Sequence, residues 1–305
     1  MITDEILTIL LKDMTTKQNI IWATDIYNSK YGRRYAKNLQ ISLQDTKIIM
    51  PRIKKSLQDQ TRRAKSNAEV FTPSWICNKQ NNLIDNAWFG AENMFNYETD
   101  TGWQTNPEKI IFPTDKHWKQ YIDANRLEIT CGEAPYLTSR YDTVTGVQIA
   151  IADRIGLLDR KLRIVSENTD TQKEWLKYAL KSMQSIYGYD YQGDNVLLAR
   201  KNILLTILEF YEDKYNMPME HKQISKFANV IKYNIWQMDG LKFIVPNTCS
   251  NIEIVEYTFF GENIVSEKCQ GCTKGDNAKH NGTYCTIKDW KENKIIRFID
   301  LATRQ

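Results

Sequence analysis

Four cysteine and histidine side chains in the last forty residues have a spacing suited to a metal ion. Two residues separate Cys269 from Cys272, seven separate Cys272 from His280, and four separate His280 from Cys285. Three thiolates and one imidazole from a short loop match the tetrahedral coordination that Zn²⁺ prefers. The spacing therefore predicts a structural zinc site at these four residues. The alternatives are a set of free thiols beside an exposed histidine, or a lysine-flanked knuckle that contacts nucleic acid.

A second group of residues is suited to holding a small ligand. The stretch 127–137 starts apolar, passes through the polar turn Thr130-Cys131-Gly132-Glu133, and ends in residues that favour a helix. A strand that runs into a tight glycine turn lets the backbone approach a ligand closely. One such turn is common in proteins, so the pattern predicts a cofactor loop only together with further matching elements.

The segments around this loop alternate between helical and extended patterns. Apolar side chains recur at helical spacing over 175–186 and 195–211, whereas 186–190 and 233–237 are short extended runs. Alternation of this kind favours a parallel sheet with crossover helices. After Asp239-Gly240 the chain becomes rich in strand-forming residues.

Four elements resemble, in the right order, those of S-adenosylmethionine-dependent DNA adenine methyltransferases. Phe71-Thr72-Pro73 resembles the Phe-Thr-Pro element that holds the methionine end of the cofactor, and Thr130-Cys131-Gly132 with Tyr136-Leu137 resembles motif I. Asp190 stands where the second strand of the family ends in a carboxylate that takes both ribose hydroxyls. Asp239 matches the acidic residue near the adenine amino group. Each match also has a structural explanation, as a core side chain, a turn or a solvated strand end.

The resemblance implies an α/β, Rossmann-like methyltransferase fold in a small relative of restriction-modification methylation subunits. It implies two cofactors or ligands, S-adenosylmethionine and DNA. The residues implied for cofactor binding are Phe71, Thr72, Thr130, Cys131, Gly132, Glu133, Asp190 and Asp239. The chain departs from the family at Ala134, which replaces the usual second glycine and is followed by Pro135, and in a long insertion over 138–186 whose role the sequence leaves open.

The catalytic turn of these enzymes, Asn/Asp-Pro-Pro-Tyr/Phe, holds the flipped base, but the sequence contains no Pro-Pro pair. Its Asn106-Pro107 pair precedes motif I. Three explanations stay open: another chain supplies the turn, an atypical loop such as 245–248 replaces it, or the protein is a non-catalytic, phage- or defence-related factor that binds DNA or a protein. Activity as an enzyme is therefore left undecided, and catalytic residues are not assigned.

Charge is unevenly distributed along the chain. The net charge is +4, and residues 1–66 contain thirteen Lys/Arg and six Asp/Glu, a balance compatible either with phosphate contacts or with a solvated helix face. We expect a basic helical arm over 1–68, a cofactor-binding domain over 69–245, and a strand-rich segment with the zinc site, similar to a knuckle insertion, over 246–305. The sequence has no apolar run of about 20 residues and no basic-then-apolar secretion pattern, so we expect a cytoplasmic protein without a membrane partner.

Overall fold

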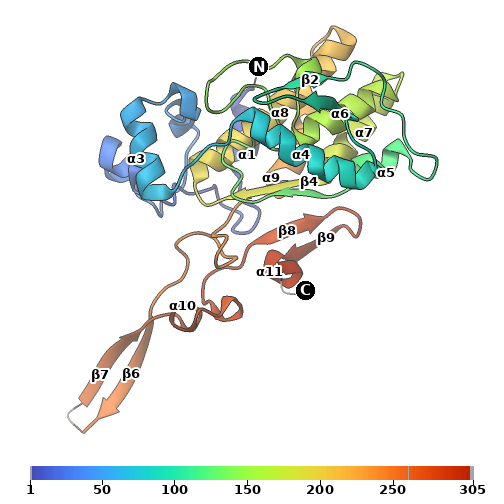
Figure 1. Cartoon of the computed structure of the whole chain (residues 1–305). Helices are drawn as coiled ribbons and strands as arrows, with labels where there is room; N and C mark the ends of the chain where they lie inside the picture. Colours follow the sequence, from blue (N-terminus) through green and yellow to red (C-terminus); the bar gives the residue numbers. More distant parts are fainter. Residues whose placement is uncertain (1, 260, 303–305) are drawn as a thin grey trace.

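A three-stranded parallel sheet organises the chain (Figure 1). The computed structural model describes residues 2–259 and 261–302. The parallel strands, in their order in the sheet, are β3 (Arg126–Glu128), β4 (Ile186–Asp190) and β5 (Ile235–Gln237). Because the strands are parallel, their carboxyl ends meet at one edge, which is where sheets of this kind bind ligands.

Helices connect these strands, as the alternating patterns predicted. The first crossover contains α6 (Leu157–Glu167) and α7 (Gln172–Gln184), and the second contains α8 (Gly193–Tyr215) and α9 (His221–Asn234). The 138–186 insertion is therefore the first crossover. Its charged residues Arg160 and Lys161 are buried: Arg160 pairs with Asp85, and Lys161 donates to the carbonyls of Ile122 and Ala124.

Arg200 joins helices α8, α9 and α1 (Asp4–Leu11). Its buried guanidinium donates to the carbonyls of Leu10, Lys12, Lys232 and Ile235. The last carbonyls of a helix lack partners within the helix, so a buried cation there satisfies the ends of both α1 and α9. Burial lowers the pKa of Arg200 to about 10.

The amino-terminal residues contribute directly to the main core. The first 31 residues contain α1 and a separate α2 (Ile26–Tyr31). Asp13 ends the helical path by accepting hydrogen bonds from the amide and hydroxyl of Thr16, and residues 20–22 then run extended beside 39–41. The residues of α1 that are at most 1% exposed and belong to the main core are Ile6, Leu10 and Leu11.

The opposite face of the sheet is covered by the last elements of the chain. They are β8 (Thr286–Asp289), β9 (Lys294–Arg297) and α11 (Phe298–Ala302). Tyr189 and Trp236 of the sheet pack with Cys285 and Phe298 in a second, smaller core. The mixed α/β class is thus confirmed. Within the described residues the parallel sheet is one βαβαβ unit, and a hairpin lies on the face where a doubly wound sheet would have helices.

The remaining elements surround this frame. The helices are α3 (Leu57–Asn67), α4 (Ser74–Phe89), α5 (Trp118–Asp123) and α10 (Gln270–Lys274). The strands are β1 (Asn96–Glu98), β2 (Trp103–Thr105), β6 (Ile252–Thr258) and β7 (Gly261–Glu267). The short 3-10 helices are η1 (Arg33–Tyr35), η2 (Gln44–Lys47), η3 (Arg52–Lys54), η4 (Ile151–Asp153) and η5 (Asn277–Lys279). Among the described helices, none combines the length and apolar character needed to cross a membrane.

Candidate cofactor pocket and metal centre

A cavity of about 810 Å³ opens at the carboxyl ends of β3 and β4. Its floor is the loop Thr130-Cys131-Gly132, which continues β3, and its walls come from 68–72, helix α4 and residues 190–195. The amide of Cys131 donates to the Tyr189 carbonyl over 2.8 Å, so the loop stays attached to β4 before it turns. The sequence-predicted residues that the structure brings together here are Phe71, Thr72, Thr130, Cys131, Gly132 and Asp190.

The loop turns through left-handed backbone at alternate residues. Thr130, Gly132 and Ala134 have φ values of 47°, 52° and 66°. A Cβ at Gly132 would meet the Phe71 ring only at 3.5 Å, so the conformation rather than a lack of space favours glycine. Ala134, the departure from the family pattern, adopts a positive φ despite its Cβ and lies buried beneath the loop.

Asp190 ties the two strand ends together. Its Oδ2 accepts from the amide of Gly132 over 2.9 Å, and its Oδ1 accepts from the amide of Gln192 over 2.8 Å. Burial raises the pKa of Asp190 to about 6, although the two amide hydrogen bonds oppose that shift. Asn195 Nδ2 also donates to Oδ1 over 3.5 Å. Because a carboxylate has about four acceptor positions, about one remains for a donor on a ligand.

Three buried acceptor oxygens around this cavity have no hydrogen-bond partner among the described residues: Glu128 Oε2, Asn81 Oδ1 and Gln192 Oε1. The amide orientations follow from their other contacts, since Asn81 Nδ2 donates to two carbonyls and Gln192 Nε2 donates to Glu69. Buried polar groups are nearly always satisfied in native proteins. Each of the three atoms is enclosed within the wall of the cavity rather than exposed to it.

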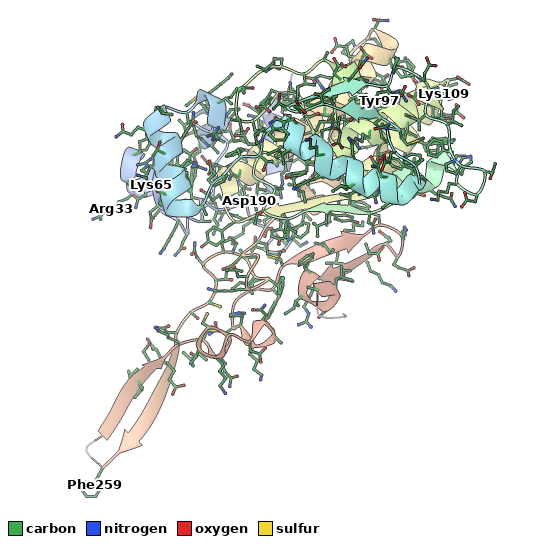
Figure 2. The ribbon with its side chains drawn as sticks, viewed as in Figure 1. Arg33, Lys65, Tyr97, Lys109, Asp190 and Phe259 are labelled. Carbon is green, nitrogen blue, oxygen red and sulfur yellow. The ribbon has the colours of Figure 1, made fainter. Side chains whose placement is uncertain are left out.

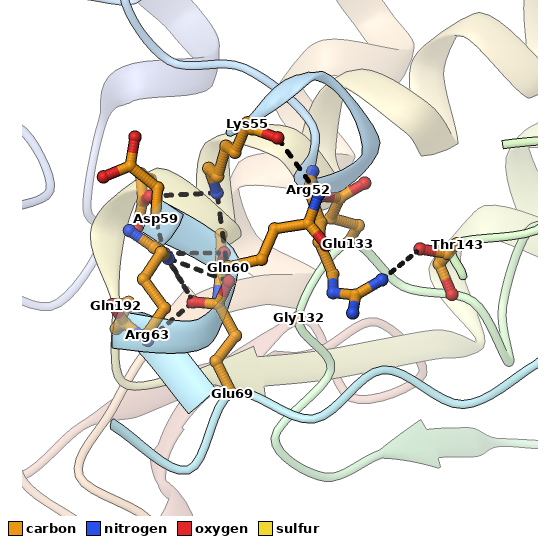
Figure 3. A network of polar contacts seen from close by, with 12 residues as sticks. Arg52, Lys55, Asp59, Gln60, Arg63, Glu69, Gly132, Glu133, Thr143 and Gln192 are labelled. Carbon is orange, nitrogen blue, oxygen red and sulfur yellow. Dashed lines mark hydrogen bonds and ion pairs between the residues drawn. The ribbon is translucent and has the colours of Figure 1, made fainter. Parts of the chain in front are cut away.

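The cavity has an acidic lining. Glu69, Glu128 and Asp190 line it, and none of its described lining residues is Lys, Arg or His. Burial raises the pKa of Glu128 well above the usual value, and the charge of Asp190 adds to the shift. The Glu69 carboxylate is balanced from behind, where the buried Arg63 binds Glu69 and, over 2.8 Å, Asp194 (Figure 3). The ionised Asp190 carboxylate therefore suits a ligand that carries hydrogen-bond donors or positive charge.

Two residues that the resemblance implied lie outside this cavity. The Glu133 carboxylate turns away and accepts from the Arg52 amide and the Tyr141 hydroxyl, both at 2.5 Å. Asp239 follows β5, two strands from β3, and its carboxylate accepts from the amide of Leu241. Two strand spacings are about 10 Å, which explains why a pocket between the ends of β3 and β4 does not include it.

Sequence reasoning missed Glu128, Asn81 and Gln192. Glu128 carried a usable signal, because it is a charged residue between Leu127 and Ile129, directly before the glycine turn. Asn81 had a weaker one, since it lies in a run of amides on α4. Gln192 had none, because only the fold places it beside Glu69.

A separate group of side chains could hold a metal ion. The potential ligand atoms of Cys249, Cys269, Cys272 and His280 all lie within 4.8 Å of one another. His280 Nδ1 is 3.5 Å from the Cys249 sulfur, 3.7 Å from that of Cys269 and 3.6 Å from that of Cys272. The other ring nitrogen, Nε2, is buried without a partner among the described residues. Burial opposes ionisation of the Cys269 thiol, but the amides of Cys272 and Asn281 and the His280 ring lower its pKa to about 6.

Cys285, which the spacing predicted as the fourth ligand, is not in this group. It immediately precedes β8, its sulfur faces the Gln237 carbonyl at 3.3 Å, and it is fully buried in the smaller core. Its amide and carbonyl bond to Phe243 and Phe298, which holds it against the sheet. The structure places Cys249 where Cys285 was expected.

The comparisons with known proteins add no relative. No family model, no curated protein and no solved structure matches this chain.

Proposed function

We propose that the cavity at the ends of β3 and β4 binds S-adenosylmethionine and that the protein is a DNA adenine methyltransferase-like protein. The observation that carries this proposal is the Asp190 carboxylate at the end of β4, bonded to the Gly132 amide, in a cavity whose described lining has no cationic side chain. The ordered resemblance of Phe71-Thr72-Pro73, the Gly132 loop and Asp190 to the methyltransferase family supports the same ligand.

The ligand carries hydrogen-bond donors and positive charge, whereas the described lining of the cavity has no cationic side chain. S-adenosylmethionine has an ammonium and a sulfonium cation, two ribose hydroxyls and an adenine amino group. Asp190 has an acceptor position left for a ribose hydroxyl, and its negative charge would favour a nearby cation. A dinucleotide or nucleoside triphosphate would instead bring phosphates beside the Asp190 carboxylate, with no lining cation to offset the repulsion.

In this proposal the chain positions the cofactor and excludes water from it. The Gly132 turn brings backbone close to the ligand, and Phe71 packs over that turn. The bound cofactor would supply an activated methyl group. The resemblance assigns the exocyclic amino group of adenine in DNA as its acceptor.

A second candidate function is cofactor binding without independent methyl transfer. The specific observation in its favour is that none of the seven prolines is adjacent to another, so the Pro-Pro turn that holds the flipped base is missing from the sequence. In this alternative a partner chain completes the site, or the protein is a binding factor of a restriction-modification or phage-defence system.

Calorimetric titration tests the proposed ligand. We expect S-adenosylmethionine to bind and ATP not to bind. Asp190→Asn should weaken binding by about 10–100-fold, because it removes a charged acceptor worth about 1.5–3 kcal/mol. Asp239→Asn is the matched control: the resemblance places Asp239 at the adenine, but it lies outside the cavity, so we expect unchanged affinity. No binding to the folded protein, or tighter binding of ATP, would exclude this ligand.

Transfer is measured separately with a tritium-labelled methyl group. Label incorporated into unmethylated DNA by the isolated chain would establish the enzyme. Cofactor binding without incorporation would instead support the second candidate.

A further inference from the structure

We propose that Cys249, Cys269, Cys272 and His280 bind one structural Zn²⁺. The ion would cross-link the base of the β6–β7 hairpin, where β6 begins and β7 ends. This inference is independent of the proposed cofactor, because the cluster belongs to a different part of the chain. It adds Cys249, which lies outside the spacing from Cys269 to Cys285, to the ligand set. It also assigns the ion a role in stabilising the hairpin.

The distances fit a tetrahedral ion. Zinc–sulfur bonds of about 2.3 Å and zinc–nitrogen bonds of about 2.0 Å place tetrahedral ligand atoms about 3.5–3.8 Å apart. The sulfurs of Cys249 and Cys269 are 3.7 Å apart, and His280 Nδ1 lies 3.5–3.7 Å from the three sulfurs. A disulfide would require sulfurs at about 2.05 Å, and all six cysteines are free thiols in this structure.

The backbone packs tightly against the cluster residues at two glycines. A Cβ on Gly271 would lie 2.6 Å from the His280 amide nitrogen, and one on Gly282 would lie 3.0 Å from that of Cys249. The Asn281 amide also donates to the Cys269 sulfur over 3.2 Å, and its side chain exchanges hydrogen bonds with the backbone of Ser250. Hydrogen bonds from amides to sulfur are typical of thiolate ligands, whose charge they stabilise. Four protein ligands leave no open position, so the ion would be structural.

The chain enters and leaves the base of the hairpin through this cluster. Cys249 lies three residues before β6, and Cys269 lies two residues after β7. Strands β6 and β7 are antiparallel, and the pair nearest the base is Ile252 with Glu267. Extending that register beyond the strands places Cys249 opposite position 270, beside Cys269. The metal would therefore cross-link the hairpin at its base.

The hairpin needs such a link. It projects away from the body, with Phe259 at its tip (Figure 2). Ile252, Val255 and Ile264 are 44%, 43% and 64% exposed. An isolated two-stranded hairpin in water is marginally stable at best. A cross-link at the base limits the conformations open to both strands, as a disulfide does.

Metal analysis of the purified full chain under reducing conditions tests the ligand set. We expect one zinc per chain in the wild-type protein. Cys249→Ser should lose it, whereas the matched control Cys285→Ala should retain it. Replacement of zinc by Co²⁺ should give the intense visible bands of a tetrahedral thiolate site, weakened by Cys249→Ser alone. Zinc retained by Cys249→Ser but lost from Cys285→Ala, or a metal-free wild-type protein, would overturn the assignment.

Hydrogen–deuterium exchange tests the cross-link. After the metal is removed with a chelator, we expect amides in β6 and β7 to exchange at least about tenfold faster, whereas those of β3, β4 and β5 stay protected. Unchanged exchange in the hairpin would show that the ion does not hold its base, even if the metal is present.

Discussion

The free-energy cost of burying an ionised carboxylate in the proposed site can be measured at Asp190. Its carboxyl is buried at the end of β4, and burial raises its pKa to about 6 from 3.8. The folded protein therefore holds this proton more tightly than the unfolded chain does. The resulting stabilisation is fully present below about pH 4 and is lost as the pH rises through 6. A shift of about two pKa units corresponds to about 3 kcal/mol.

Asp190→Asn removes this titration. The variant also alters the hydrogen bonds from Gly132 and Gln192, but that effect does not depend on pH. Between pH 4 and pH 7.5 we therefore expect the wild-type protein to lose about 2–3 kcal/mol of unfolding free energy relative to the variant. Bound cofactor should reverse part of this loss, because hydroxyl donors and a nearby cation favour the ionised carboxylate.

Urea denaturation of both proteins at half-unit pH intervals measures the effect. The difference between the two unfolding free energies cancels the titrations that they share. A difference that stays constant from pH 4 to pH 7.5 would refute the assigned burial of Asp190. Calorimetry in the wild-type protein is the companion measurement, and its affinity for S-adenosylmethionine should fall as the pH drops below about 6.

Three further predictions concern the loop, the buried ion pairs and the basic surface. Gly132→Ala should destabilise the protein by about 1–2 kcal/mol in chemical denaturation because its φ is 52°; Ala134→Gly, which relieves a similar strain but adds chain entropy, should stay within about 1 kcal/mol of wild type. Arg63→Met should lower the unfolding free energy by about 3–5 kcal/mol in the same assay by leaving Glu69 and Asp194 buried without that partner, whereas Arg62→Met, at a half-exposed pair with Asp59, should lower it by less than about 1 kcal/mol; equal effects would contradict the network. Arg33 and Lys65 are exposed at one end of the body (Figure 2), so if DNA binds there, Arg33→Gln with Lys65→Gln should reduce the salt slope of binding by about 2 in fluorescence anisotropy without changing cofactor affinity; an unchanged slope would place DNA elsewhere.

Local patterns were informative wherever one element carries its own signal. The run Ile186 to Asp190 was predicted as a strand and is β4. The predicted alternation of strands and helices is present in β3, β4 and β5 with their crossovers. Hydrophobic periodicity does not show where α1 ends, because the side-chain contacts of Asp13 that follow it are not part of that pattern.

The basic clusters show the same limit. Arg63 follows Arg62 in sequence, yet Arg62 pairs with Asp59 at the surface, whereas Arg63 is 2% exposed between Glu69 and Asp194. Net charge counts both residues alike. Only the packing of α3 against 69–72 and α8 shows that Arg62 is available to a partner. The same packing shows that Arg63 is buried, where it binds Glu69 in the pocket wall.

By itself the sequence determined the alternation of strands and helices, the loop at Gly132, the carboxylate at Asp190 and three of the four clustered metal-site residues, because each depends on neighbours close in the chain. Tertiary structure decided that Asp239 lies outside the pocket, that Glu128, Asn81 and Gln192 line it, and that Cys249 replaces Cys285. The physical reason is that a site forms where segments distant in sequence converge. The antiparallel pairing of β6 with β7 brings Cys249 to Cys269 across twenty residues, and no spacing rule over adjacent residues contains that pairing.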